Sequence, residues 1–216
     1  MAFISSTRAD AAATTDATAA AAAAALAPAD DLASLALRLD DPDAGVRRWA
    51  ARDLQRVDGA SAVLAARLAC EVDAAVRDVI LTSLTRRGDV DAVSALVAAL
   101  RSEDAARRNE AIEAMKALPE EVALVMGALL ADPDSDVRIM AVNVLESLRH
   151  PQVESWLIGV IEHDAVVNVC GAAVDLLGEV GTAAARAPLA RLRERFADEP
   201  YIVFAADLAQ QRLGKE

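Results

Sequence analysis

The chain is poor in aromatic residues and has no long, strongly apolar run. Aromatic residues make up 3% of its 216 residues, whereas 55% are apolar, so the core must be built mainly from small and aliphatic side chains. No alternating run of β-branched residues leads into an Asn-Gly or Asp-Gly turn, which argues against a β-sheet protein. No stretch of about eighteen strongly apolar residues occurs, so we expect no membrane-spanning helix. The fold class that remains is all-α.

Lysine is also scarce, and the balance of charge is acidic. Only Lys116 and Lys215 accompany the arginines among 22 basic residues, and the formal net charge is −12. An acidic surface repels phosphate backbones, so we expect no nucleic-acid partner. The sequence pI is about 4.6.

What the chain does have is a block that recurs about every thirty residues. Each block runs from an aspartate to an arginine, except that the fifth copy is degraded. The copies begin at Asp43, Asp73, Asp104, Asp134 and Asp164. Self-similarity at this period is typical of stacked repeats, in which no unit buries its apolar face alone.

Each block opens a helix with the same apolar stripe. Three repeat positions, four residues apart, fall on one helical face. Their occupants are Val46, Val76, Arg107, Val137 and Val169; then Ala50, Ile80, Ala111, Ala141 and Ala173; then Leu54, Leu84, Met115, Leu145 and Leu177. We call these segments the second helices of helix pairs.

Start and stop signals frame the pairs. Asp43, Asp73, Asp104 and Asp134 are suited to cap the second helices, and glycines predict helix ends at Gly88, Gly178 and Gly181. A sixth second helix is expected over 201–213 as a C-terminal cap. The first helices are expected at about 29–39, 60–70, 90–101, 120–130, 151–161 and 182–196.

The N-terminal residues 1–28 differ from the rest. Alanine dominates residues 19–27, and the end of this run imitates a signal-peptidase site, but Asp10 and Asp16 interrupt the apolar region that a signal peptide needs. We therefore expect a low-complexity tail over 1–28, partly helical, and a solenoid domain over 29–216.

The two cysteines lie in different repeats. Cys70 falls in the second repeat and Cys170 in the fifth, and stacked helices are spaced by about 8–10 Å. A disulfide needs Cα atoms within about 7 Å, so we expect free thiols and a reducing, cytoplasmic location.

These residues resemble a known family. The run from Asp41 to Leu54, and again from Asp132 to Leu145, is similar to bacterial HEAT repeats of the short form found in phycobilisome lyases. The resemblance implies an α-solenoid of about six helix pairs in a right-handed superhelix, with the second helices on the concave side. Arg107 replaces the usual valine, and Cys170 the usual arginine.

Charged residues at the block suggest a ladder between repeats. Stacking aligns the arginines, so each can pair with an aspartate at the head of its own or a neighbouring second helix; the alternative is a row of guanidinium groups for a carboxylate or phosphate ligand. We predict the structural ladder, formed by Asp43, Arg47, Asp73, Arg77, Asp104, Arg108, Asp134 and Arg138.

Other positions on the second helices vary between repeats. In the first, Arg48 and Arg52 share a face beside Trp49, although Trp49 is equally suited to seal the end of the core. Variable positions on a constant frame are typical of partner recognition. The predicted contacts are Arg48, Trp49, Arg52, Asp78, Asn109, Glu113, Asn143 and Asp175.

No pattern requires catalysis, a metal or a cofactor. His150 and His163 have no ligand cluster at metal spacing, and the run 132–136 imitates a calcium loop without its glycine and glutamate. The leading prediction is a non-catalytic scaffold that binds another protein in the concave groove, without a membrane, nucleic-acid or small-molecule partner. The resemblance leaves a bilin lyase as an alternative, and a HEAT-like DNA glycosylase as a third that the acidic positions disfavour. The sequence does not name the partner.

Overall fold

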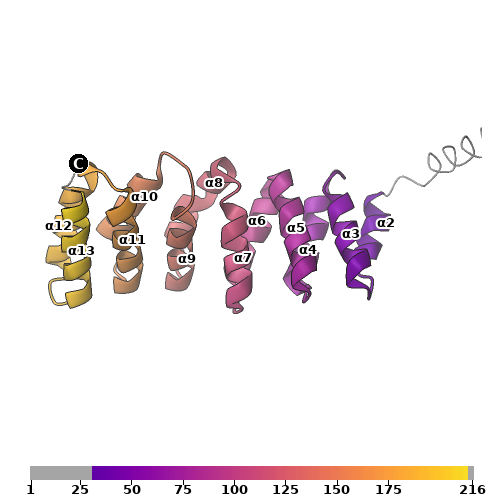
Figure 1. Cartoon of the computed structure of the whole chain (residues 1–216), viewed down its shortest axis with the longest axis horizontal. Helices are drawn as coiled ribbons and strands as arrows, with labels where there is room; N and C mark the ends of the chain where they lie inside the picture. Colours follow the sequence, from indigo (N-terminus) through magenta and orange to yellow (C-terminus); the bar gives the residue numbers. More distant parts are fainter. Residues whose placement is uncertain (1–30, 214–216) are drawn as a thin grey trace, which may run out of the picture.

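The computed structural model describes residues 31–213 as a row of helices, with no strand among them (Figure 1). The predicted tail over 1–28 lies outside the described residues. The first helices of the pairs are α2 (Leu32–Leu39), α4 (Ala60–Cys70), α6 (Val90–Ala99), α8 (Pro119–Leu130), α10 (Val153–His163) and α12 (Arg186–Arg195). The second helices are α3 (Ala44–Leu54), α5 (Ala74–Arg87), α7 (Ala105–Met115), α9 (Ser135–Leu145), α11 (Val167–Val180) and α13 (Pro200–Arg212). The predicted all-α solenoid is therefore confirmed.

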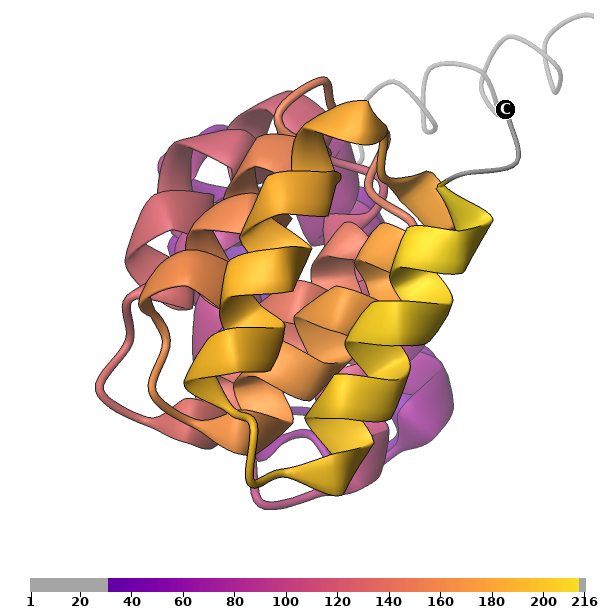
Figure 2. The same cartoon turned by 90° about the vertical axis from the view of Figure 1, so that its left-hand side faces the viewer.

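The pairs stack into two layers. Figure 1 shows the second helices in one layer along the long axis, with the first helices behind them. Each second helix contacts the next, from α3 to α13, and the end view in Figure 2 shows α12 and α13 side by side as the last pair. No described helix is long and apolar enough to cross a bilayer.

The core lies between the layers and follows the repeat. All ten residues at the second and third stripe positions are buried, from Ala50 and Leu54 to Ala173 and Leu177. At the first position three valines are buried, while Val46 is half-buried because it belongs to the first described pair. The periodic stripe thus identifies the residues that stack one repeat on the next.

Aspartate caps set the starts of the second helices. The Asp43 Oδ1 accepts the Gly45 N–H at 2.6 Å, and Asp73 accepts the Ala75 N–H at 2.9 Å. Asp104 and Asp134 do the same for Ala106 and Asp136. The degraded fifth copy has Val166 at this position and no side-chain cap.

Two predicted boundaries are wrong. Gly178 does not end a helix but lies inside α11, where it is buried and an added Cβ would lie 3.5 Å from the Cα of Ala209. The helix ends at Gly181 instead. The predicted helix over 182–196 divides into a 3-10 turn, Ala183–Ala185, and α12. Gly88 ends α5 as predicted, with φ of +59°.

Candidate protein-binding face

The arginines of the block link their own loop to the next repeat. The Arg47 Nη1 donates to the Asp41 and Pro42 carbonyls at 2.9 and 3.0 Å, and its Nε and Nη2 grip Glu71 at 2.8 and 2.9 Å. Arg138 repeats this pattern, donating to the Asp132 carbonyl and to both oxygens of Asp164. Such forked, charge-assisted bonds fix geometry as well as energy.

The carboxylate bound by Arg47 differs from the predicted ladder, whereas Arg138 binds Asp164, the aspartate that begins the fifth block. The aspartates at the heads of the second helices are occupied by backbone N–H groups, and Asp43, Asp73, Asp104 and Asp134 therefore act as caps. The Arg47 partner, Glu71, lies two residues before the cap and has no exposed side-chain area. Burial alone raises the pKa of Glu71, but hydrogen bonds from Arg47, the Asp73 N–H and Arg67 outweigh it and lower that pKa to about 2.

The ladder is irregular at the third repeat. Ser102 occupies the position of Glu71 there, so Arg77 pairs with Glu110 on α7 instead, at 2.8 Å. Arg108 bonds to the carbonyls of its own loop, at Ser102 and Glu103. Asp132, the carboxylate that Arg108 would reach by analogy, is held by Arg101.

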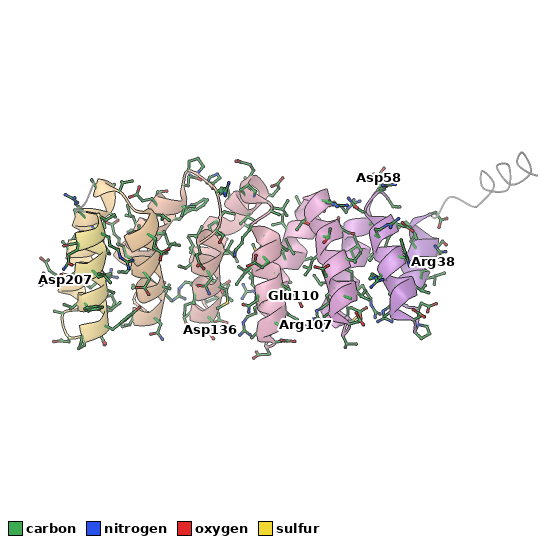
Figure 3. The ribbon with its side chains drawn as sticks, viewed as in Figure 1. Arg38, Asp58, Arg107, Glu110, Asp136 and Asp207 are labelled. Carbon is green, nitrogen blue, oxygen red and sulfur yellow. The ribbon has the colours of Figure 1, made fainter. Side chains whose placement is uncertain are left out.

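Arg107 and Cys170 depart from the repeat pattern, and other hydrogen bonds compensate at both positions. Arg107 reaches back to the end of α4, where Nη1 donates to the Leu68 and Ala69 carbonyls at 3.1 and 3.2 Å. Figure 3 shows Arg107 on α7, on the side facing α5. At the fifth repeat Arg195 of α12 takes the place of the missing arginine and donates to the Asp164 carbonyl at 2.8 Å. Burial raises the pKa of the Cys170 thiol beside it.

The predicted contact residues lie on the exposed side of the second helices, which we call the groove face. Seven of the eight are exposed, and Asn143 is half-buried. Asp78, Asn109 and Glu113 line a groove of about 670 Å³ between α5 and α7. Asn143 and Asp175 line a smaller one of about 250 Å³ between α9 and α11.

The groove face differs in charge between its α3–α5 part and its α9–α11 part. On α3, the turn that follows it and α5, the exposed basic residues are Arg48, Arg52, Arg56 and Arg86, with Asp78 as a neighbouring acid. The groove between α9 and α11 is lined by Glu146, Asp175 and Glu179 and by no basic side chain. A charge pattern of this kind favours one orientation of a bound partner.

Aromatic side chains lie at both ends. Trp49 is 55% exposed, and the Arg52 guanidinium stacks 4.4 Å from the centre of its ring. Trp49 therefore offers most of its ring to solvent or a partner. The helix α13 was predicted only as a C-terminal cap. Three of its exposed residues share one helical face: Tyr201, Phe204 and Leu208. Their spacing of three and four residues was the available signal. Tyr201 also donates to Asp175 at 2.8 Å.

A separate cleft lies on the layer of first helices. It has a volume of about 530 Å³ between α4 and α6, and alanines form much of its wall. Arg107 and Glu110 also line it, so it opens at the seam where the ladder is irregular. Among residues 31–213 no group of three His, Cys, Asp or Glu side chains is arranged to hold a metal ion.

Taken together, six stacked helix pairs with a variable exposed face define a repeat protein. Residues 122–210 match the HEAT repeats family, which confirms the predicted resemblance to HEAT repeats over this part of the chain. No curated protein matches the chain.

Solved structures with a similar fold have low sequence identity to it. A HEAT-like repeats protein from the archaeon Thermococcus onnurineus NA1 is 17% identical over 85% of this chain and 87% of its own, with a TM-score of 0.44. An engineered protein is 18% identical over 85% and 96%, with a TM-score of 0.39. The complex of CpcE and CpcF of phycocyanin lyase from Nostoc sp. PCC7120 is 17% identical over 84% and 94%, with a TM-score of 0.36.

Proposed function

We propose that this chain is a non-catalytic scaffold that binds a segment of a partner protein along the groove face. The observation that carries the proposal is a contrast between the buried and capping residues, which repeat, and the exposed residues of the groove face, which vary. The stripe and cap residues recur in nearly every repeat, while the exposed residues one turn away change from Arg52 to Glu113 to Asp175. Stacked repeats present extended surfaces of this kind for recognition.

The grooves suit a partner that contacts several repeats at once. The one between α5 and α7 has an open polar wall of Asp78, Asn109 and Glu113, which provides hydrogen-bond acceptors rather than a closed pocket. A partner lying across α3 to α11 meets arginines first and carboxylates last. We therefore expect recognition to depend on charge order as well as on shape.

Site-specific photo-crosslinking tests the face. A photoreactive phenylalanine at Asn109, on the groove face, is compared with one at Leu124, which is 86% exposed on α8 in the other layer. In lysate of the native host we expect a protein adduct at Asn109 and none at Leu124. Equal adducts at both positions, or adducts at Leu124 alone, contradict the assignment.

A charge-reversal variant then tests the contacts. With an identified partner, Arg48→Glu together with Arg52→Glu should weaken binding at least about tenfold, because both guanidinium groups are exposed and near Trp49. Glu194→Arg on α12, also exposed, is the matched control. Unchanged binding by the folded double variant removes α3 from the interface.

A further inference from the structure

The third block lacks a carboxylate that the loops of the other four blocks carry. Two residues before the N-cap of each second helix from α3 to α11, one side chain accepts the N–H of the cap residue. This side chain is acidic in four blocks, at Asp41, Glu71, Asp132 and Asp164. In the third block it is Ser102, which accepts the Asp104 N–H at 3.2 Å and bears no charge. The loop before α7 is therefore one carboxylate short.

The same block carries an additional guanidinium group. Arg107 stands where the other blocks have valine, and its Nη1 and Nη2 donate to three backbone carbonyls at the end of α4 and just beyond it. These carbonyls bear no formal charge. Among the described residues, the one carboxylate oxygen within 4 Å is Asp104 Oδ2, which lies 3.9 Å from the Arg107 Nε, beyond hydrogen-bond distance. The third block thus has one acid fewer and one cation more than a regular block.

The cleft between α4 and α6 reaches this block. Ser102 and Arg107 both line it, and the Arg107 side chain is 22% exposed, so a bound molecule can contact it. The walls are formed largely by alanines of α4 and α6, namely Ala62, Ala65, Ala69, Ala95, Ala98 and Ala99. The alanines of α4 extend over about 10 Å of helix. The volume of about 530 Å³ lies within the range of small-molecule sites, which is about 300–1,000 Å³.

The basic residues lie at one end of this cleft. Arg101 and Ser102 follow the end of α6, and Arg107 bonds to carbonyls at the end of α4. Arg101 and one further lining arginine are already paired with carboxylates, which leaves Arg107. Asp91, a lining carboxylate without an arginine partner among the described residues, belongs to the first turn of α6, at the opposite end. The cleft therefore combines apolar walls with a cation at one end.

We propose that the cleft binds a small amphiphilic carboxylate, such as a medium-chain fatty acid. Its hydrocarbon chain lies between the alanines of α4 and α6, and its carboxylate accepts from Arg107 and Ser102. Within the described part of the chain, neither the Arg107 Nε nor the Ser102 hydroxyl donates a hydrogen bond. The ligand carboxylate takes the place of the loop acid that the third block lacks.

This site is independent of the groove face, because it lies in the layer of first helices. The sequence alone predicted no small-molecule partner, since alanines that line a cleft look like alanines of a core. The net charge of −12 makes the expected preference diagnostic. An acidic surface attracts cations without specificity, whereas the apolar walls act equally on any head group. A preference for an anionic head therefore requires the local guanidinium group.

Isothermal titration calorimetry on the purified full chain compares three head groups on one hydrocarbon chain. The probes are decanoate, decanol and decyltrimethylammonium, each below the concentration at which it forms micelles. We expect one decanoate to bind per chain, and the neutral and cationic probes to bind at least about tenfold more weakly. Absence of decanoate binding, or an equal or higher affinity for either other probe, overturns the proposal.

Variants locate the two parts of the ligand. Ser102→Glu restores the loop acid of the other blocks and should weaken decanoate binding at least about tenfold, because its own carboxylate reaches the arginines. Arg107→Val should lower the affinity for decanoate to that for decanol. Ala98→Leu fills the cleft and should weaken both probes, whereas Ala66→Leu, an equally exposed alanine of α4 outside the cleft, should change neither.

Urea unfolding establishes that each variant is folded before its affinity is compared. Decanoate binding that Ser102→Glu and Ala98→Leu both leave unchanged would place the ligand elsewhere and refute this site. Equal weakening by Ala98→Leu and Ala66→Leu would do the same. Either result leaves the crosslinking test of the groove face at Asn109 unaffected.

Discussion

Replacing Glu71 by glutamine tests the inter-repeat ladder at its most buried point. The Glu71 carboxylate accepts from Arg47 at 2.8 and 2.9 Å, from the Arg67 Nε at 2.9 Å and from the Asp73 N–H at 2.8 Å. Glutamine keeps the shape of the side chain and removes the charge. Two guanidinium groups then lose the carboxylate that balances them.

The magnitude follows from the Glu71 pKa. Burial raises it, but the three sets of hydrogen bonds lower it overall from 4.5 to about 2. Because the folded-state pKa lies below the unfolded one, this stabilisation is fully present above about pH 4.5 and is lost as pH falls toward 2. The difference corresponds to about 3 kcal/mol, and the hydrogen bonds that the glutamine oxygen still accepts reduce the expected loss to about 2 kcal/mol.

Urea unfolding followed by circular dichroism measures the effect. At pH 7 we expect Glu71→Gln to unfold with about 2 kcal/mol less free energy than the natural chain, and at pH 3 with less than half that difference. Glu113→Gln, whose side chain is 73% exposed, is the matched control and should change stability by less than about 0.5 kcal/mol. A Glu71 effect of equal size at both pH values would refute the electrostatic reasoning.

Three further predictions concern single positions. Gly171→Ala places a methyl group 2.7 Å from the Tyr201 ring and should displace that ring. Burial and the hydrogen bond to a carboxylate raise the Tyr201 pKa, so this pKa should fall toward its ordinary value of 10.0 in the variant. Phenolate absorbance measures the change directly because the chain has one tyrosine. In the native protein the exposed Cys70 should react with Ellman's reagent while the buried Cys170 should not, and reaction of both thiols before unfolding would contradict the packing of α11. Arg107→Val restores the usual repeat residue but removes the bonds to the end of α4, so we expect a loss of about 1 kcal/mol in urea unfolding; a gain in stability would show that valine packing outweighs these bonds.

The frame of this protein could be predicted from its sequence because it is periodic. Ile80, Ala111 and Ala141 occupy the same position in three successive repeats and are all buried, so several copies report the same physical requirement. The capping aspartates were predictable for a similar reason, since few side chains can accept hydrogen bonds from the free N–H groups at a helix start. The charged contacts on the exposed face stay a prediction, because no repeat constrains them.

The ladder partners could not be derived in this way. A guanidinium group reaches several residues, and both nearby carboxylates accept a backbone N–H, Glu71 from Asp73 and Asp73 from Ala75, so capping alone does not predict which of them the arginine binds. Gly178 shows the same difficulty, because a glycine that ends a helix and one that lies inside it look alike in sequence. Only the structure places Gly178 inside α11, where it is buried.

The third repeat shows how one substitution redirects its neighbours. Once serine replaces the carboxylate at position 102, Arg77 needs another acid, and Glu110 on α7 provides it. Glu110 and Leu81 line both the groove between α5 and α7 and the cleft between α4 and α6, so these two side chains border both surfaces at this seam. Arg47 and Arg138 each bind a loop carboxylate, whereas Arg77 links two second helices directly. A partner that engages Glu110 from the groove would therefore act on the contact between the second and third repeats, and the stability of this seam should respond to occupancy of the groove face more than that of any regular step.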